Sequence, residues 1–337
     1  MYTRLLSPGD KKGAKLTAEE LESISNSFNE TLHSGLWGLT PASATLPWLS
    51  SAIAMLTVAH SAVKSLIYEL KSDGGNSLLS WYLDNSVKVL DVCNCISSEI
   101  ERLCLHHLNL RIAIQLLRSE GNPSEEEIRQ ARDLLADSEG EGGSGSVNST
   151  GDIEKLIKDL ATSIGKPALR GKDTPVDGVV QRAVRAISFV TAFITGVISS
   201  ALHSSSGAVV CVCVPEEFPW GDSVRSIEST VIVESRRGEE RDRKTRVLKE
   251  LDNVGAHMRH VLEAIDEVLA SGGGGATTGR LREAAVGLEK ANEAMLEGLY
   301  RLRDGVNELF MMVVRIRKKM VDEFRASLWE RSLPKKL

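Results

Sequence analysis

Four long stretches of the sequence carry apolar residues spaced alternately three and four apart, and this pattern constrains the fold more than any other feature. Such spacing places the apolar side chains on one stripe of an α-helix. The stripes run through residues 49–70, 79–117, 247–268 and 281–320. Helices with stripes this long bury them against one another, so the sequence predicts an all-α fold built as an elongated antiparallel helical bundle.

Turn-forming residues divide the stripes into two pairs. The run SDGGN at 72–76 follows the first stripe, and Ser271 followed by four glycines ends the third. Residues of these types favour chain reversal. We therefore expect two long helical hairpins, at about 46–118 and 245–325, joined by flexible Gly/Ser-rich linkers.

Four polar residues interrupt the apolar stripes: His60, Ser86, His107 and Asn292. Reflection across the turn places His60 opposite Val89, so we expect His60 and His107 not to meet, and to be satisfied core or edge residues. Two interpretations stay open for Asn292 in the last stripe. Asn292 is either partly exposed, or buried so that it fixes the register between two helices.

Glycines within the last stripe predict close helix packing. Gly287, Gly298 and Gly305 lie between apolar positions of this stripe. Each glycine costs a helix up to about 1 kcal/mol relative to alanine. We expect close approach of a neighbouring helix to compensate for that cost.

The rest of the chain is predicted to form one domain with tails. A helical-bundle domain is expected over 17–325, after a disordered tail at 1–16 and before a basic tail at 326–337. Inside the domain, DSEGEGGSGSVNSTG at 137–151 predicts a flexible linker, and 203–245 reads as an irregular charged segment with a strand or extended stretch at 207–214. Three helix starts are predicted in this part of the chain, at the capping box of Ser124 and Glu127, at Asp152 as an N-cap, and at the dipeptide Thr174-Pro175.

Composition excludes several classes of protein. Aromatic residues make up 4% and hydrophobic residues 42% of the chain, so the core is aliphatic and aromatic-rich β-folds are disfavoured. The net charge of −5 gives no general electrostatic reason to bind nucleic acid. Five cysteines, an odd number, indicate a reducing compartment. The N-terminal residues lack a signal-peptide core, so we expect a protein that is not secreted, while a transit peptide stays open.

The sequence carries no motif of a known enzyme class. Phosphate-binding loops, dinucleotide-binding glycine motifs, nucleophile elbows and zinc-protease motifs are absent. Two C-x-C pairs, Cys93/Cys95 and Cys211/Cys213, resemble metal ligands. Residues two apart on a helix point in nearly opposite directions, and two thiols do not complete a tetrahedral site. We expect no catalytic site, no metal and no cofactor.

Residues 183–202 include a long uncharged segment that allows two interpretations. The run AISFVTAFITGVISSAL at 186–202 is either a buried core helix or a membrane-inserted helix, near the lower limit of the roughly 20 residues that span a bilayer. In the second case the residues contacting the membrane are Ile187, Phe189, Val190, Phe193, Ile194, Val197 and Ile198. A basic cluster of Arg315, Arg317, Lys318 and Lys319 either complements a helix C-terminus or contacts anionic lipid or an acidic partner.

One run of residues resembles the plant Bypass-related family. It reads YLDNSVKVLDVCN from Tyr82 to Asn94, and the stretch 298–310 is similar to the family's C-terminal helix. The family motif comprises Tyr82, Leu83, Asp84, Ser86, Val87, Lys88, Leu90, Asp91, Cys93 and Asn94. We expect a structural role for it, because its apolar members fit the helical stripe and its charged members are spaced to pair on a helix surface.

The resemblance implies a non-enzymatic plant protein that regulates development. One branch of the family restrains a mobile root-derived signal that arrests shoot growth, and a related branch associates with exocyst subunits in secretion. This implies an adaptor of root and shoot development with protein partners, exocyst subunits among them, in the cytoplasm or at the endoplasmic reticulum or another membrane. The alternative is a tethering or trafficking factor anchored through 183–202. The sequence sets no oligomeric state.

Overall fold

A computed structural model gives the fold of the chain. It describes residues 16–40, 42–70, 75–118, 122–141, 147–163, 174–202, 214, 218–239, 248–271 and 275–332. These residues form nine α-helices, which confirms the all-α class. The helices are α1 (Ala18–Trp37), α2 (Leu46–Leu70), α3 (Gly75–Leu117), α4 (Glu125–Glu141), α5 (Val147–Ser163), α6 (Pro175–Leu202), α7 (Gly221–Glu239), α8 (Lys249–Ser271) and α9 (Gly275–Ser332).

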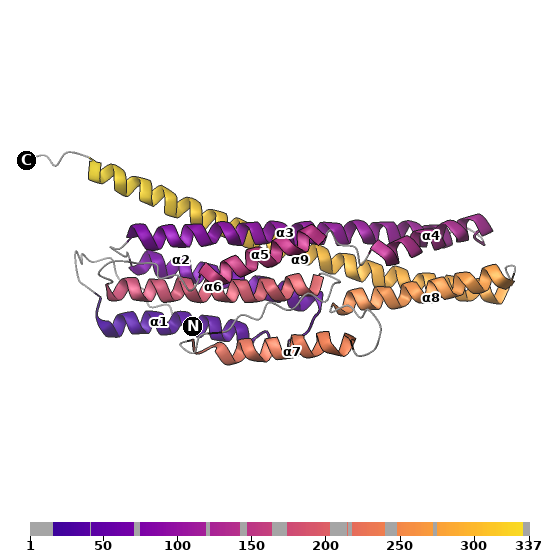
Figure 1. Ribbon diagram of the computed structural model, residues 1–337, viewed down its shortest axis with the longest axis horizontal. Coiled ribbons are helices and arrows are strands. Elements are labelled where there is room, and N and C mark those ends of the chain that lie inside the picture. The colour runs from indigo at the N-terminus through magenta and orange to yellow at the C-terminus, as the bar shows by residue number, and fades with distance from the viewer. Residues whose placement is uncertain are drawn as a thin grey trace, which may run out of the picture.

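Two four-helix bundles lie end to end, and the two longest helices, α3 and α9, run through both (Figure 1). In the first bundle α3 and α9 pack with α2 and α6, and in the second they pack with α4 and α8. Helix α1 covers α2 and α6, α7 packs on α1, and α5 packs on α3 and α6. The apolar stripe of α9 is buried from Leu281 to Met320, because the two bundles cover it in turn.

The predicted hairpins differ in how their helices pack. Helices α8 and α9 are direct neighbours, as predicted. Helices α2 and α3 follow one another in the sequence, but α9 and α6 each pack against both of them. Helices α2 and α3 therefore lie at diagonal corners of the first bundle. A stripe shows which side of a helix is buried but not which helix covers it.

The two bundles are joined where the N-termini of α2 and α8 meet. The backbone amide of Leu46 donates to Oε1 of Glu250 at 3.0 Å, so this carboxylate lies at the positive end of α2. The backbone amide of Lys249 donates to the carbonyl of Ala44, also at 3.0 Å. These contacts fix α2 and α8 in line with each other beside α9.

The glycines of α9 allow the close packing that the sequence predicted. A Cβ atom added at Gly298 would lie 2.5 Å from Cδ1 of Leu46, and one at Gly305 would lie 3.3 Å from Cγ2 of Ile53, both in α2. At Gly287 the added atom would lie 2.9 Å from Nδ1 of His257 in α8. Larger residues at these positions would require the facing side chains of α2 and α8 to shift, most of all at Gly298.

Two segments that were predicted to be irregular contain helices. Helix α7 occupies 221–239 of the expected charged segment, so that prediction is wrong there. The helix is anchored by the fully buried Trp220, whose ring centroid lies 4.7 Å from that of Phe218 and 5.8 Å from that of Phe189. Helix α4 continues to Glu141 and α5 begins at Val147, so the linker prediction is also wrong over most of 137–151. Of the extended stretch predicted at 207–214, all but Val214 lies outside the described residues.

Three helices begin with reciprocal side-chain caps. Ser124 and Glu127 form the predicted capping box at α4. At α6, the hydroxyl of Thr174 accepts from the amide of Asp177, and the carboxylate of Asp177 accepts from the amide of Thr174. Helix α1, which was not predicted as a separate element, starts with the same arrangement at Thr17. These caps satisfy backbone donors that a helix start leaves open.

Candidate functional site

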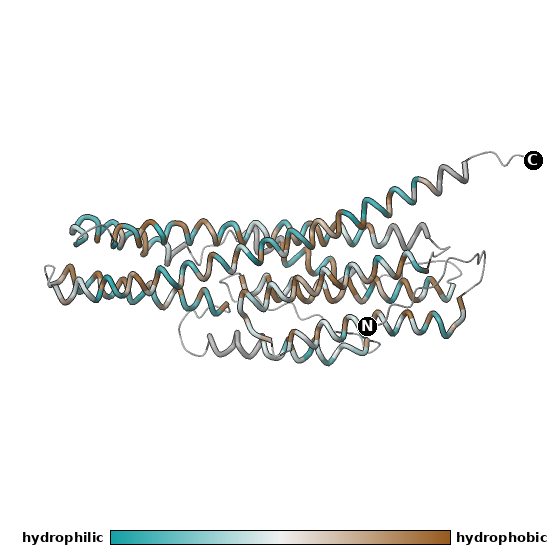
Figure 2. The backbone as a smooth tube through the Cα atoms, turned by 180° about the vertical axis from the view of Figure 1, so that it is seen from behind, coloured by the Kyte–Doolittle hydropathy of each residue, from teal (hydrophilic) through white to brown (hydrophobic). Residues whose placement is uncertain are grey.

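The segment considered for membrane contact lies in the core of the first bundle. The seven residues predicted to contact a membrane are each at most 2% exposed; they are Ile187, Phe189, Val190, Phe193, Ile194, Val197 and Ile198. Within the described residues, α2 and α6 are long and apolar enough to cross a membrane, but 89% of the most apolar window of α6 is buried inside the protein. Figure 2 shows this apolar concentration in the first bundle. The structure therefore favours the buried-core interpretation.

His60 is buried and neutral. Nε2 of His60 lies 3.1 Å from Oγ1 of Thr191 in α6, and that hydroxyl donates to the carbonyl of Ile187 at 2.7 Å. Because the proton of the Thr191 hydroxyl is donated to that carbonyl, Nε2 of His60 is the donor in the hydrogen bond between His60 and Thr191. Within the described residues, Nδ1 of His60 has no partner. Burial lowers the pKa of His60 from 6.5 to about 4.

His107 and Asn292 connect α3 with α9. Nδ1 of His107 lies 2.6 Å from Oδ1 of Asn292, and Nδ2 of Asn292 donates to the backbone carbonyl of His107 at 3.2 Å. Asn292 is 2% exposed, so the expectation of partial exposure is wrong. Because a shift of one helix along the other would break both hydrogen bonds, the pair fits the register-setting interpretation.

The cysteines do not gather into a metal site in the described part of the chain. No group of three or more His, Cys, Asp or Glu side chains is placed there to hold a metal ion. Cys93 is buried, and burial raises the pKa of its thiol to about 12, whereas Cys95 is partly exposed on another side of α3. Cys211 and Cys213 lie outside the described residues.

The family motif lies on α3 in the first bundle and connects this helix with two others. Nη1 of Arg317 in α9 donates to the carbonyl of Leu83 and to Oγ of Ser86. Nζ of Lys88 donates to the carbonyl of Asp159 in α5 at 3.0 Å. Sequence reasoning placed Arg317 in a basic cluster but missed this contact, because spacing on one helix does not show which residues of another helix lie opposite.

The remaining motif residues divide between the core and the surface. Tyr82 and Cys93 are buried, and Leu90 is partly buried. The exposed members are Asp84, Val87, Asp91 and Asn94.

Replacement of Arg317 by Met is expected to destabilise the protein. Hydrogen bonds from a charged group contribute about 1.5–3 kcal/mol, so the free energy of unfolding should fall by about that amount. Arg315 is exposed two residues earlier, and Arg315→Met should change stability by less than about 0.5 kcal/mol. Urea denaturation followed by circular dichroism measures both variants. Equal stability of the two would contradict a structural role for Arg317.

The outer surface of α3 carries exposed apolar residues that the stripe does not explain. Leu105, Leu108 and Ile112 are 64%, 41% and 50% exposed and are spaced three and four apart. Large apolar residues grouped on one surface, unlike single ones, mark interaction sites in soluble proteins. They lie near the junction between the two bundles.

Tyr300 is an exposed aromatic residue on α9, the helix that packs along α3. It is 39% exposed, and the guanidinium carbon of Arg303 lies 4.9 Å from its ring centroid. Burial raises the pKa of the thiol of Cys104, which precedes Leu105 in α3, and the charge of Arg303 offsets part of this rise. We call Leu105, Leu108, Ile112 and Tyr300 the α3–α9 face. It was missed from the sequence, although apolar residues at helical spacing outside the stripe were a visible signal.

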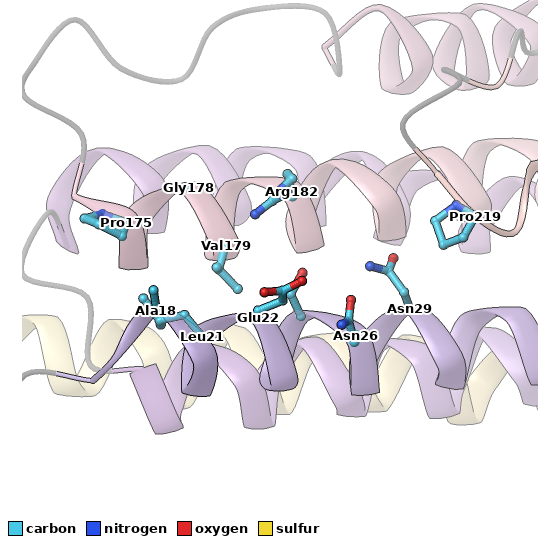
Figure 3. A pocket seen from close by; sticks show the side chains of 11 residues that line it. Ala18, Leu21, Glu22, Asn26, Asn29, Pro175, Gly178, Val179, Arg182 and Pro219 are labelled. Carbon is cyan, nitrogen blue, oxygen red and sulfur yellow. The ribbon is translucent and has the colours of Figure 1, made fainter.

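A polar groove lies between α1 and the start of α6 (Figure 3). It has a volume of about 600 Å³ and opens to solvent. Glu22, Asn26 and Asn29 of α1 face Arg182 of α6 across it. More of its lining is polar than apolar, whereas most sites for small organic ligands are predominantly apolar. We therefore take the α3–α9 face, and not this groove, as the candidate functional site.

Fold and surface together define an elongated all-α bundle protein with an exposed apolar face at its middle. The chain belongs to the ROH1-like family, whose model, described as "Protein ROH1-like", matches residues 138–324, more than half of the chain. No solved structure matches it.

Several plant proteins are similar to this chain. UPF0496 protein 4 of Oryza sativa subsp. japonica is 30% identical over 86% of this chain and 61% of its own length. Protein BPS1, chloroplastic, of Arabidopsis thaliana is 28% identical over 74% of this chain and 72% of its own. Protein ROH1D of the same plant is 25% identical over 73% of this chain and 72% of its own length. The chain therefore spans about three fifths of the length of the rice relative. The similarity to BPS1 confirms the resemblance to the Bypass-related family.

Proposed function

We propose that this protein is a non-enzymatic adaptor in the development of plant roots and shoots, and that it binds a protein partner through the α3–α9 face. The observation that carries the proposal is the row of Leu105, Leu108 and Ile112, which are between 41% and 64% exposed on a helix whose other side is buried. Membership of the ROH1-like family and similarity to BPS1 support a developmental role.

Binding would proceed by burial of apolar helix surface. A partner helix laid along α3 would cover residues at positions i, i+3 and i+7, which is the spacing of anchors in helix-groove recognition. Tyr300 and Arg303 would border the contact, and both residue types are common in protein interfaces.

Charged substitutions on the α3–α9 face test this function. The double variant Leu105→Glu/Ile112→Glu is expected to fold with a free energy of unfolding within about 1 kcal/mol of the original, because both side chains are exposed. In plants that lack the gene, it should fail to restore root and shoot growth. Val58 is 59% exposed on α2, outside the face, and Val58→Glu should restore growth fully. Equal rescue by the double variant would contradict the proposal.

Reciprocal grafting addresses the mobile signal that the family resemblance implies. If the protein restrains a root-derived signal that arrests shoot growth, roots without the gene should arrest an unmodified shoot. Roots expressing the Leu105→Glu/Ile112→Glu variant should do the same. Normal growth of shoots on roots without the gene would exclude this role. The adaptor would then act in a process other than the restraint of a root-derived signal.

A second candidate is an exocyst-linked trafficking factor associated with a membrane. It is supported by the ROH1-like family match and by the two helices, α2 and α6, that are long and apolar enough to cross a bilayer. Anchoring through residues 183–202 would require α6 to leave the bundle core. Carbonate-resistant pelleting of the full chain with membranes would favour this candidate, and recovery in the soluble fraction would favour the adaptor.

A further inference from the structure

Two tyrosine hydroxyls are buried without a partner at the end of the first bundle, where α2, α3 and α9 meet. Tyr82 of α3 is 3% exposed, and within the described residues neither its hydroxyl nor that of Tyr68 in α2 has a hydrogen-bond partner. Buried polar groups are nearly always paired, so two such hydroxyls indicate a partner group that the described residues do not supply. Ordered water or a bound ion commonly pairs with buried groups of this kind.

The surroundings of these hydroxyls are cationic. Nζ of Lys319 lies 4.3 Å from the ring centroid of Tyr68. Arg317 is held in place by its hydrogen bonds to Leu83 and Ser86, and within the described part of the chain both bonds use Nη1, so Nε and Nη2 have no partner there. Arg317 contacts Leu83 and Ser86, which follow Tyr82 along α3, and besides burial the charges of Arg317 and Tyr68 both influence the pKa of Tyr82. We call Tyr68, Tyr82, Arg317 and Lys319 the Tyr82 cluster.

Both tyrosines are protonated donors at physiological pH. Burial raises the pKa of Tyr82 well above its ordinary value, and the neighbouring Arg317 offsets only part of this. Burial also raises the pKa of Tyr68 to about 12, with a further contribution from Glu323. Glu323 is exposed on α9 and is the acidic residue that acts on Tyr68. The cluster therefore presents O–H and N–H donors together with positive charge.

We propose that the Tyr82 cluster binds an oxyanion of the phosphate type. The planar guanidinium of arginine matches the geometry of phosphate oxygens, and that of Arg317 is held in place by its hydrogen bonds to α3. Hydroxyl groups supply further hydrogen-bond donors in phosphate-binding sites. Exposed Arg315, Lys318 and Arg325 lie on the same part of α9 and would attract anions to it. The proposal goes beyond the adaptor function and does not depend on the α3–α9 face. The phosphate group belongs either to a soluble molecule or to a lipid headgroup.

Phosphate binding to the full chain tests the proposal, with Tyr82→Phe as the diagnostic variant. This variant removes an unpartnered buried hydroxyl, so it should fold with stability equal to or higher than that of the original. Tyr300→Phe makes the same change at an exposed site and is the matched control. The probes are inorganic phosphate, phenyl phosphate, and vesicles of phosphatidylcholine with or without phosphatidic acid. Calorimetry and vesicle co-sedimentation are done with sodium chloride at matched ionic strength, because salt screens non-specific attraction.

The original chain and Tyr300→Phe should bind at least one phosphate probe saturably, and Tyr82→Phe should weaken that binding by about tenfold or more. Saturable binding of inorganic phosphate or phenyl phosphate identifies a soluble source. Binding only to vesicles with phosphatidic acid, lost in Tyr82→Phe, identifies a lipid headgroup. Absence of saturable binding to any probe, or equal binding by the original chain and Tyr82→Phe, overturns the proposal and leaves water as the partner of the hydroxyls.

Discussion

Replacement of Gly298 by Ala should destabilise the protein, although alanine is favoured over glycine within a helix by about 1 kcal/mol. The added Cβ would lie 2.5 Å from Cδ1 and 3.0 Å from Cβ of Leu46, where α9 meets the start of α2. Overpacking of this kind costs about 1–3 kcal/mol. Leu46 cannot move away freely, because its backbone amide is bound to Glu250 and its side chain is fully buried. After the gain in helix propensity is subtracted, we expect the free energy of unfolding in urea to fall by up to about 2 kcal/mol.

Two further variants separate the clash from a general effect on α9. An added Cβ at Gly279 meets nothing within 4 Å, so Gly279→Ala should raise stability by up to about 1 kcal/mol. Leu46→Ala alone should cost about 2–5 kcal/mol, and its combination with Gly298→Ala should cost less than the sum, because the clash disappears. Additive losses in the double variant would show that the two residues do not compete for the same space.

The helical class and the buried side of each long helix could be predicted from the sequence. A spacing of three and four is a local property, and all twelve positions predicted for the last stripe, from Leu281 to Met320, are buried. The need for close packing at Gly298 was also predictable, because helical glycines carry a known cost. These features depend on one helix at a time.

Features that depend on two distant segments could not be predicted. The stripes of α2 and α3 fitted a direct hairpin equally well, and only the complete packing shows α6 and α9 between them. The contact of Arg317 with Leu83 and Ser86 joins residues more than 200 positions apart. Helix α7 was missed because its charged end resembles a solvated loop, whereas its anchor, Trp220, precedes the helix. The α3–α9 face was missed because single exposed apolar residues are ordinary, and only their grouping in space is informative.

Acid should destabilise this protein partly through His60. The pKa of His60 is about 4 in the folded protein and 6.5 as its ordinary value, because burial disfavours the charged form. Between these two values the unfolded chain binds more protons than the folded chain, so stability decreases as the pH falls. A difference of 2.5 units between the two pKa values corresponds to about 3 kcal/mol. The loss should begin near pH 6.5 and be complete near pH 4.

A neutral replacement isolates the contribution of His60. His60→Gln keeps an amide donor that can reach Oγ1 of Thr191 but does not titrate, so its stability should fall less between pH 7 and pH 4.5 than that of the original chain. His33 is exposed on α1, and His33→Gln should retain the pH dependence of the original. Urea denaturation at several pH values measures all three proteins. Parallel curves for His60→Gln and the original chain would mean that water reaches His60, and that its protonation does not oppose folding.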